Sequence, residues 1–222
     1  MPFPFTLKCC CCTLYVHGED SFLIAGCVGD TTLTLDAARL ALVGPRQGVC
    51  SNEYTYDAGF QSDLLAWVTA GGRLFLTGEY VQCFDLAYPS NSTDYNNLLG
   101  YLGSAMQLTT NFPFGCPETA DCADATPAAI GVMDALPAPL KYVAGGEISG
   151  GTPLAYTSTI YTPNGCDVPH VLMAAEQIGD GLVVACASSQ VFGLPGECDM
   201  TGICELLRRL CNWPIADIME AV

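Results

Sequence analysis

A glutamate and a tyrosine stand where many α/β enzymes hold a nucleophile. The strand predicted at residues 73–77 is apolar through its three central residues and is followed by Gly78. Glu79 and Tyr80 come next, and Cys83 comes three residues later. A strand that ends in a sharp turn exposes the side chain at the turn, which is how such enzymes present serine or cysteine. Tyrosine, with a pKa of about 10, is a poor nucleophile at neutral pH. We therefore expect the turn without the nucleophilic chemistry.

A second group of polar side chains, Ser188, Ser189 and Gln190, follows a late apolar segment. Ligands of open α/β sheets bind outside the carboxyl ends of the strands. With Glu79 and Tyr80, these residues are candidates for a polar ligand pocket, for example for a sugar. The favoured interpretation is simpler: they cap strand ends and satisfy backbone groups.

The segment His17-Gly18-Glu19-Asp20 gathers an imidazole and two carboxylates. His17, Glu19 and Asp20 are weak candidates for metal ligands, because a metal site would need further ligands from elsewhere. A turn between two strands explains the same residues, so we predict no metal site. His170 opens an apolar segment and is interpreted as a hydrogen-bonded residue at a strand end.

Fourteen cysteines are a high number for this chain. Most are expected to be buried thiols, since cysteine behaves as a small hydrophobic residue. Two short loops could close as disulfides in an oxidising compartment, Cys116–Cys122 and Cys198–Cys204.

The composition excludes several classes of protein. Half of the 222 residues are hydrophobic and 14% are charged, which indicates a folded chain. The net charge of −16 argues against nucleic acid as a partner. No apolar segment is long enough to span a membrane, so a soluble protein is expected. The N-terminus is a poor signal peptide, which predicts synthesis in the cytoplasm and leaves the final location open.

The elements that must position these side chains alternate between strand and helix. Residues 1–35 are rich in β-forming segments and are predicted to be an N-terminal extension, followed by one α/β domain at residues 36–222. Ser62 is a candidate N-cap for a helix through Thr69, and Asp94 for the next helix. Further strands or strand-and-turn segments are predicted at residues 38–45, 73–77, 130–137, 140–149, 153–161, 170–178 and 181–188, with a last helix at 204–213.

The order of these segments resembles the class I glutamine amidotransferase-like superfamily, and within it the trehalose-utilisation-like and uncharacterised branches. The resemblance is carried by a helix, Gly71-Gly72, a strand and GEY, then NNLLGYLG, then IGDGLVVACASSQVF, and finally Asn212-Trp213. It covers residues 36–215. It implies a flavodoxin-like, mainly parallel sheet with helices on both faces.

The chain departs from the active members at both catalytic positions. Those proteins carry cysteine in a G-x-C-x-G turn and a later His-x-Glu pair. Here Tyr80 takes the place of the cysteine and Gln82 that of the second glycine. The sequence has Ser188-Ser189-Gln190 where the His-x-Glu pair is expected, and no histidine follows His170. Amidotransferase chemistry is therefore not expected.

The resulting hypothesis is a catalytically silent domain that acts as a structural or interaction module in a larger assembly, such as a virus particle or filament. Protein partners or self-assembly are expected, and no cofactor is. One alternative is a carbohydrate-binding domain that uses the pocket described above. Another is a hydrolase with unfamiliar residues, in which Glu79 acts as a base.

Overall fold

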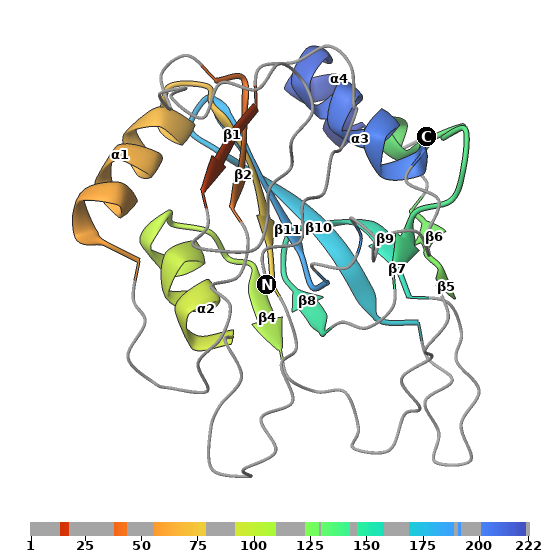
Figure 1. Cartoon of the computed structure of the whole chain (residues 1–222), viewed down its shortest axis with the longest axis horizontal. Helices are drawn as coiled ribbons and strands as arrows, with labels where there is room; N and C mark the ends of the chain where they lie inside the picture. Colours follow the sequence, from red (N-terminus) through yellow and green to blue (C-terminus); the bar gives the residue numbers. More distant parts are fainter. Residues whose placement is uncertain are drawn as a thin grey trace, which may run out of the picture.

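A mixed α/β architecture is shown by the computed structural model (Figure 1). The structure describes residues 14–17, 38–43, 56–78, 92–109, 123–128, 130–142, 146–157, 169–188, 191 and 201–220. The helices are α1 (Ala58–Thr69), α2 (Ser92–Tyr101), α3 (Thr201–Asn212), α4 (Ile215–Met219) and the 3-10 turn η2 (Gly131–Met133). The strands are β1 (Leu14–His17), β2 (Leu40–Val43), β3 (Arg73–Thr77), β4 (Gln107–Thr109), β5 (Ala123–Asp124), β6 (Thr126–Pro127), β7 (Lys141–Tyr142), β8 (Glu147–Ser149), β9 (Thr152–Tyr156), β10 (Val171–Ile178) and β11 (Gly181–Cys186).

Seven of the described strands form one sheet, in the order β1-β2-β3-β11-β10-β9-β6. The first four pair in parallel, and the last three continue the sheet in antiparallel fashion. The expected α/β sheet is confirmed, but only its β1-to-β11 half is parallel. β1 is paired with β2 in this same sheet. Most of residues 1–35 lie outside the described residues, so the domain boundary at residue 35 stays a prediction.

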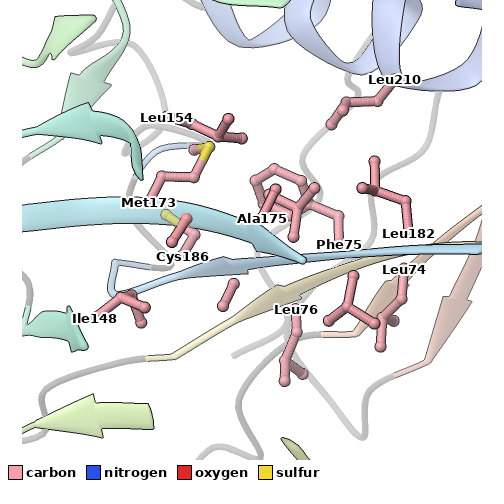
Figure 2. Packing of buried hydrophobic residues seen from close by; sticks show 14 of the residues in the cluster. Leu74, Phe75, Leu76, Ile148, Leu154, Met173, Ala175, Leu182, Cys186 and Leu210 are labelled. Carbon is pink, nitrogen blue, oxygen red and sulfur yellow. The ribbon is translucent and has the colours of Figure 1, made fainter. Parts of the chain in front are cut away.

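The central strands β3 and β11 have buried apolar cores, residues 74–76 and 182–186, because both sheet faces are covered. Successive side chains of a strand point to opposite faces. Figure 2 shows Phe75 on the face toward Leu210 of α3, whereas Leu74 and Leu76 point to the other face. Helices α1 and α2 lie on that second side, and α3 and α4 on the first (Figure 1).

Helix α1 begins four residues before the predicted N-cap. The carboxylate of Asp57 accepts hydrogen bonds from the backbone N–H groups of Gly59 and Phe60, at 2.8 and 3.2 Å. Asp57 is therefore the N-cap, and the prediction of Ser62 was wrong. Helix α2 likewise begins earlier than predicted, at Ser92.

The C-terminal half of the sheet follows the predicted strands closely. β10 and β11 form a hairpin whose turn is Gly179-Asp180, with Gly179 at φ +60°. A positive φ at this position is a conformation that glycine adopts without strain. The segment predicted as strand and turn at residues 130–137 begins with the 3-10 turn η2, so its strand assignment was wrong.

One outer strand of the seven-stranded sheet is short and contains a proline. β6 has two residues, Thr126 and Pro127, which are exposed and pair with Tyr156 and Ala155 of β9. Proline has no backbone N–H to donate to a further strand, and it is tolerated in sheets mainly at such edges. β6 therefore lies at an edge that is poorly suited to pairing.

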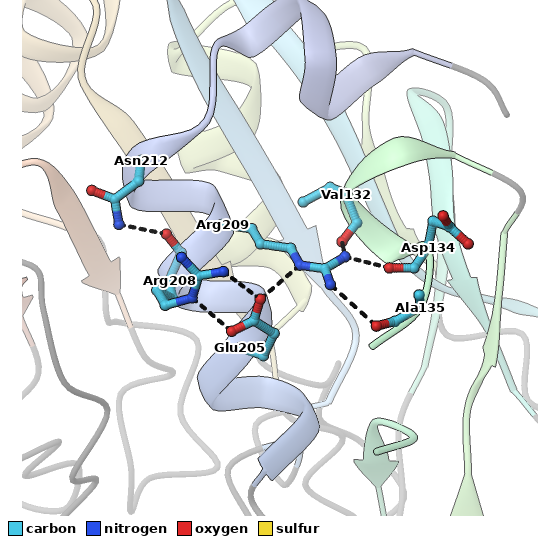
Figure 3. Close-up of polar contacts among 7 residues, drawn as sticks. All are labelled: Val132, Asp134, Ala135, Glu205, Arg208, Arg209 and Asn212. Carbon is cyan, nitrogen blue, oxygen red and sulfur yellow. Dashed lines mark hydrogen bonds and ion pairs between the residues drawn. The ribbon is translucent and has the colours of Figure 1, made fainter. Parts of the chain in front are cut away.

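Helix α3 is held to η2 by a buried guanidinium (Figure 3). Arg209 is 8% exposed, and its N–H groups donate to the backbone carbonyls of Val132, Asp134 and Ala135. Its Nε donates to Glu205 Oε1 at 2.9 Å. Arg209 thus pairs three carbonyl groups of a turn that is distant in sequence, and it is itself neutralised by a carboxylate.

Glu205 should make wild-type stability depend on pH at the acidic end. Hydrogen bonds from Arg208, and then from Arg209, lower the pKa of Glu205 from 4.5 to about 2. The carboxylate therefore stabilises the fold fully above pH 4.5 and loses this contribution as the pH falls through about 2. Urea unfolding of the wild type and Glu205→Gln at several pH values measures it. The wild-type advantage should shrink below pH 4.5, and an advantage that is independent of pH would contradict the assignment.

None of the helices within the described residues is long and apolar enough to cross a membrane.

Candidate functional site

The carboxyl ends of the parallel strands meet at one edge of the sheet, as expected for a ligand site of this architecture. β3 and β11 end side by side, with Thr77 paired to Cys186. The backbone N–H of Gly78, directly after β3, donates to the carbonyl of Cys186 at 2.8 Å. Turn residues Glu79 and Tyr80 lie outside the described residues, so their predicted exposure stays a prediction.

Tyr95 of α2 fills the space beneath this edge. It is 3% exposed, and its hydroxyl lies 3.1 Å from the carbonyl oxygen of Leu76 and 3.2 Å from that of Cys186. Burial raises the pKa of Tyr95 well above its ordinary value, so the group is a neutral donor. A Cβ on Gly78 would lie 2.7 Å from Leu108 and 3.2 Å from the Tyr95 ring. The edge is thus closely packed at the ends of β3 and β11.

Cys186 has a thiol at this edge but not the environment of a nucleophile. The side chain is fully buried, and its Sγ donates to the carbonyl of Ser188 at 3.3 Å. Burial raises the pKa of Cys186 to about 12. Reactive cysteines are thiolates in electropositive, partly exposed surroundings. The thiol therefore serves as an apolar packing group.

The burial of Cys186 predicts a large difference in alkylation rate between folded and unfolded protein. At pH 8, iodoacetamide should leave Cys186 unmodified in the folded chain over hours and modify it within minutes in denaturant, because the buried group is neither ionised nor reachable. Peptide mass spectrometry reads out the modification. Equal rates in the two states would contradict the buried position.

The structure describes only one of the five residues predicted to bind a ligand. Ser188 is 1% exposed, so its hydroxyl faces the protein interior and not an open pocket. Ser189 and Gln190 lie outside the described residues, as do Glu79 and Tyr80. A pocket formed by these residues stays a prediction.

The same edge carries a histidine–carboxylate pair that the sequence analysis missed. His170 Nδ1 lies 3.4 Å from Glu147 Oε2, and both side chains are partly exposed. His170 directly precedes β10, and its backbone exchanges hydrogen bonds with Thr157. Glu147 begins β8, and the preceding residue, Gly146, donates to the carbonyl of Ala187. An imidazole beside a carboxylate can bind hydroxyl groups of a ligand or move a proton.

The metal prediction and the disulfide predictions are tested little by the structure. The backbone of His17 ends β1, whereas Glu19 and Asp20 lie outside the described residues. Within the described residues, no three His, Cys, Asp or Glu residues gather as metal ligands.

Two cysteines of α3, Cys204 and Cys211, are disulfide-bonded. A helix rises about 10 Å over the seven steps from Cys204 to Cys211, too far for a bond between the two. Their partners therefore lie outside the described residues. Cys116, Cys122 and Cys198 lie there too, so the pairs Cys116–Cys122 and Cys198–Cys204 stay predictions.

Comparison of the sequence with protein families and with curated proteins finds no match. Solved structures do resemble the fold. The N-terminal domain of mmIFT52 is similar with a TM-score of 0.54 and 16% identity, over 80% of this chain and 79% of that one. A β-galactosidase from Rahnella sp. R3 gives a TM-score of 0.48 at 16% identity, over 84% of this chain and 24% of that one. At these identities the first likeness shows the fold alone.

Proposed function

We propose that this chain is a non-catalytic α/β domain that acts as a structural or interaction module in a larger assembly. Its scaffold is of the flavodoxin-like, amidotransferase-like type that the sequence resembles. The observation that carries the proposal is the packing of Tyr95 against the carboxyl ends of β3 and β11. This buried phenol fills the space directly beneath the ends of the two strands, which supports a packed edge over an open catalytic site.

The chemistry of this edge supports the proposal further. Cys186, the thiol nearest the end of β11, is buried with its pKa raised to about 12. The backbone amide of Gly78 is bonded to the carbonyl of Cys186 and so does not point at a substrate. Oxyanion-stabilising sites need such amides unpaired in the resting protein. The groups at the ends of β3 and β11 are thus used to hold the fold together.

The native assembly tests the proposal. The protein, isolated from its natural source without denaturation, is measured by size-exclusion chromatography and native mass spectrometry, with and without reductant. We expect a homo-oligomer or partner subunits in fixed ratio. A chain that is monomeric at all concentrations and free of partners would refute the assembly role. A glutamine hydrolysis assay on the same sample should stay at background, and turnover above it would refute the catalytic silence.

A second candidate function, carbohydrate binding, is favoured by the pair formed by Glu147 and His170. Carboxylate and imidazole groups at the carboxyl edge of a sheet are suited to the hydroxyl groups of a sugar. Calorimetry with a panel of monosaccharides and disaccharides tests it. Binding should fall about tenfold or more in Glu147→Gln, because one charged hydrogen bond is lost.

The matched control for this experiment is Asp180→Asn. Asp180 is exposed in the β10–β11 turn, at the opposite end of the hairpin from His170, and should leave binding unchanged. If none of the sugars in the panel binds, carbohydrate binding is excluded as a function and the assembly role remains the proposal.

A further inference from the structure

A pocket of about 880 Å³ lies at the opposite end of the sheet, where the parallel strands β2 and β3 begin. This volume is within the range of sites that hold small organic ligands. Residues from α1, from the start of β3 and from the end of α3 line it. The pocket is therefore separate from the carboxyl edge and from every residue discussed as a candidate ligand so far.

Two guanidinium groups, those of Arg39 and Arg73, line this pocket. The strand register places them together, because Arg73 is paired with Leu40, the residue after Arg39. Burial and the neighbouring charge of Arg39 both lower the pKa of Arg73. Two like charges thus share one pocket, in a chain that carries only 7 lysines and arginines against 23 acidic residues.

The other cations of the described residues have carboxylate partners. Lys141 pairs with Asp124, and both Arg208 and Arg209 pair with Glu205. In contrast, no carboxylate among the described residues lies within ion-pair distance of Arg39 or Arg73. The third charged residue of the pocket wall, Asp63, is exposed on α1 and makes no ion pair with a described residue.

The side chain of Arg73 is held by the C-terminal end of helix α3. In a continuing helix the carbonyl of Leu210 would accept a hydrogen bond from the backbone N–H of residue 214, but Pro214 has no N–H. Arg73 Nη1 donates to this carbonyl instead. One edge of the guanidinium is thereby fixed, and its remaining N–H groups make no hydrogen bond with a described residue. Arg73 is held in place and still has donors to offer.

An aromatic ring and small apolar side chains form part of the rest of the pocket wall. A Cβ on Gly72 would lie 2.3 Å from the Trp67 ring, so the ring lies directly against the backbone there. Ala38, Ala66 and Ala70 also line the pocket. A site with two cations, one of them held in place, beside an aromatic ring and small apolar side chains selects a ligand with one anionic group and an apolar body.

We propose that this pocket binds a small organic oxyanion, a carboxylate or a phosphate monoester, whose charged group lies between Arg39 and Arg73. A small ligand fits better than an acidic macromolecule, because the net charge of −16 repels large polyanions at long range. The inference goes beyond the proposed assembly function and does not depend on it.

Calorimetry with four probes that share a phenyl ring tests the proposal: benzoate, phenyl phosphate, benzyl alcohol and benzylamine. We expect saturable binding of benzoate, phenyl phosphate or both, weakening as salt is added, and none of the neutral and cationic probes. Tighter binding of benzoate assigns a carboxylate ligand, and tighter binding of phenyl phosphate assigns a phosphate ester. Absence of binding by both anions at millimolar concentration overturns the proposal, as does equal binding of benzyl alcohol.

Variants locate the site. Arg39 is exposed and makes no hydrogen bond within the described residues, so Arg39→Gln should fold normally and weaken anion binding about tenfold or more. Arg73→Lys keeps a donor for the carbonyl of Leu210 but lacks the planar guanidinium with its paired N–H groups. This variant should weaken anion binding several-fold. Lys141→Gln makes the same change of charge outside the pocket and should stay within about twofold. If Arg39→Gln and Lys141→Gln bind alike, the assignment is wrong.

Discussion

Replacing Arg209 by methionine is expected to lower the free energy of unfolding by about 3 kcal/mol or more. Methionine fills a similar volume but has no N–H groups, so the carbonyls of Val132, Asp134 and Ala135 lose their donor inside the protein. Ala135 has a φ of +46°, a conformation that a residue other than glycine adopts only when its surroundings impose it. Loss of Arg209 should therefore loosen this turn as well as α3.

Chemical unfolding followed by circular dichroism measures the effect, and the neighbouring arginine provides the control. Arg208 binds the same carboxylate, Glu205, but its side chain is 44% exposed, whereas that of Arg209 is 10% exposed. Arg208→Met should cost under about 1 kcal/mol. If the two variants lose similar free energy of unfolding, the stabilisation comes from pairing with Glu205 and not from the hydrogen bonds to the buried carbonyls.

Replacing Gly181 by alanine should destabilise the protein by about 3 kcal/mol or more, or prevent folding. A Cβ at this position would lie 2.0 Å from the carbonyl oxygen of Val68 and 2.4 Å from that of Gly72. Both are backbone atoms, at the end of α1 and at the start of β3, so no side-chain rotation relieves the contact. The close approach of α1 to β11 requires a glycine here.

Gly100 of α2 is the matched control for this change. A Cβ there would meet no atom within 4 Å, and the residue is exposed inside a helix. Gly100→Ala should raise stability by about 0.5–1 kcal/mol, since alanine is the better helix former. Thermal and urea unfolding of the two variants should shift in opposite directions. Equal shifts would contradict the packing described for Gly181.

The central strands could be predicted because buried strands consist mainly of apolar residues. The segments that form β3 and β11 contain uninterrupted apolar stretches, residues 74–76 and 182–186, as expected where helices cover both faces of a sheet. Helix starts and short turns were harder. Asp57 caps α1 through two backbone N–H groups, a role that Ser62 could also have filled by residue type.

The turn at Gly131–Met133 and the two residues after it could not be found from local sequence, because three of their carbonyl groups are paired by Arg209, more than seventy residues away. The candidate site also depends on contacts between residues that are distant in sequence. Glu147 and His170 meet because β8 and β10 come together at one edge of the fold, and neither residue stands in a recognisable motif. Likewise, the two arginines of the pocket become neighbours only through the pairing of β2 with β3.

The two outer strands of the sheet differ in what they can offer to another chain. β6 presents two residues, one of them the imino acid Pro127, so a further strand finds few hydrogen-bonding groups there. β1 is twice as long and pairs along its whole length with β2. Among the described strands, backbone pairing between subunits is thus disfavoured on the β6 side, so strand pairing through the β1 side would join two subunits and not extend further.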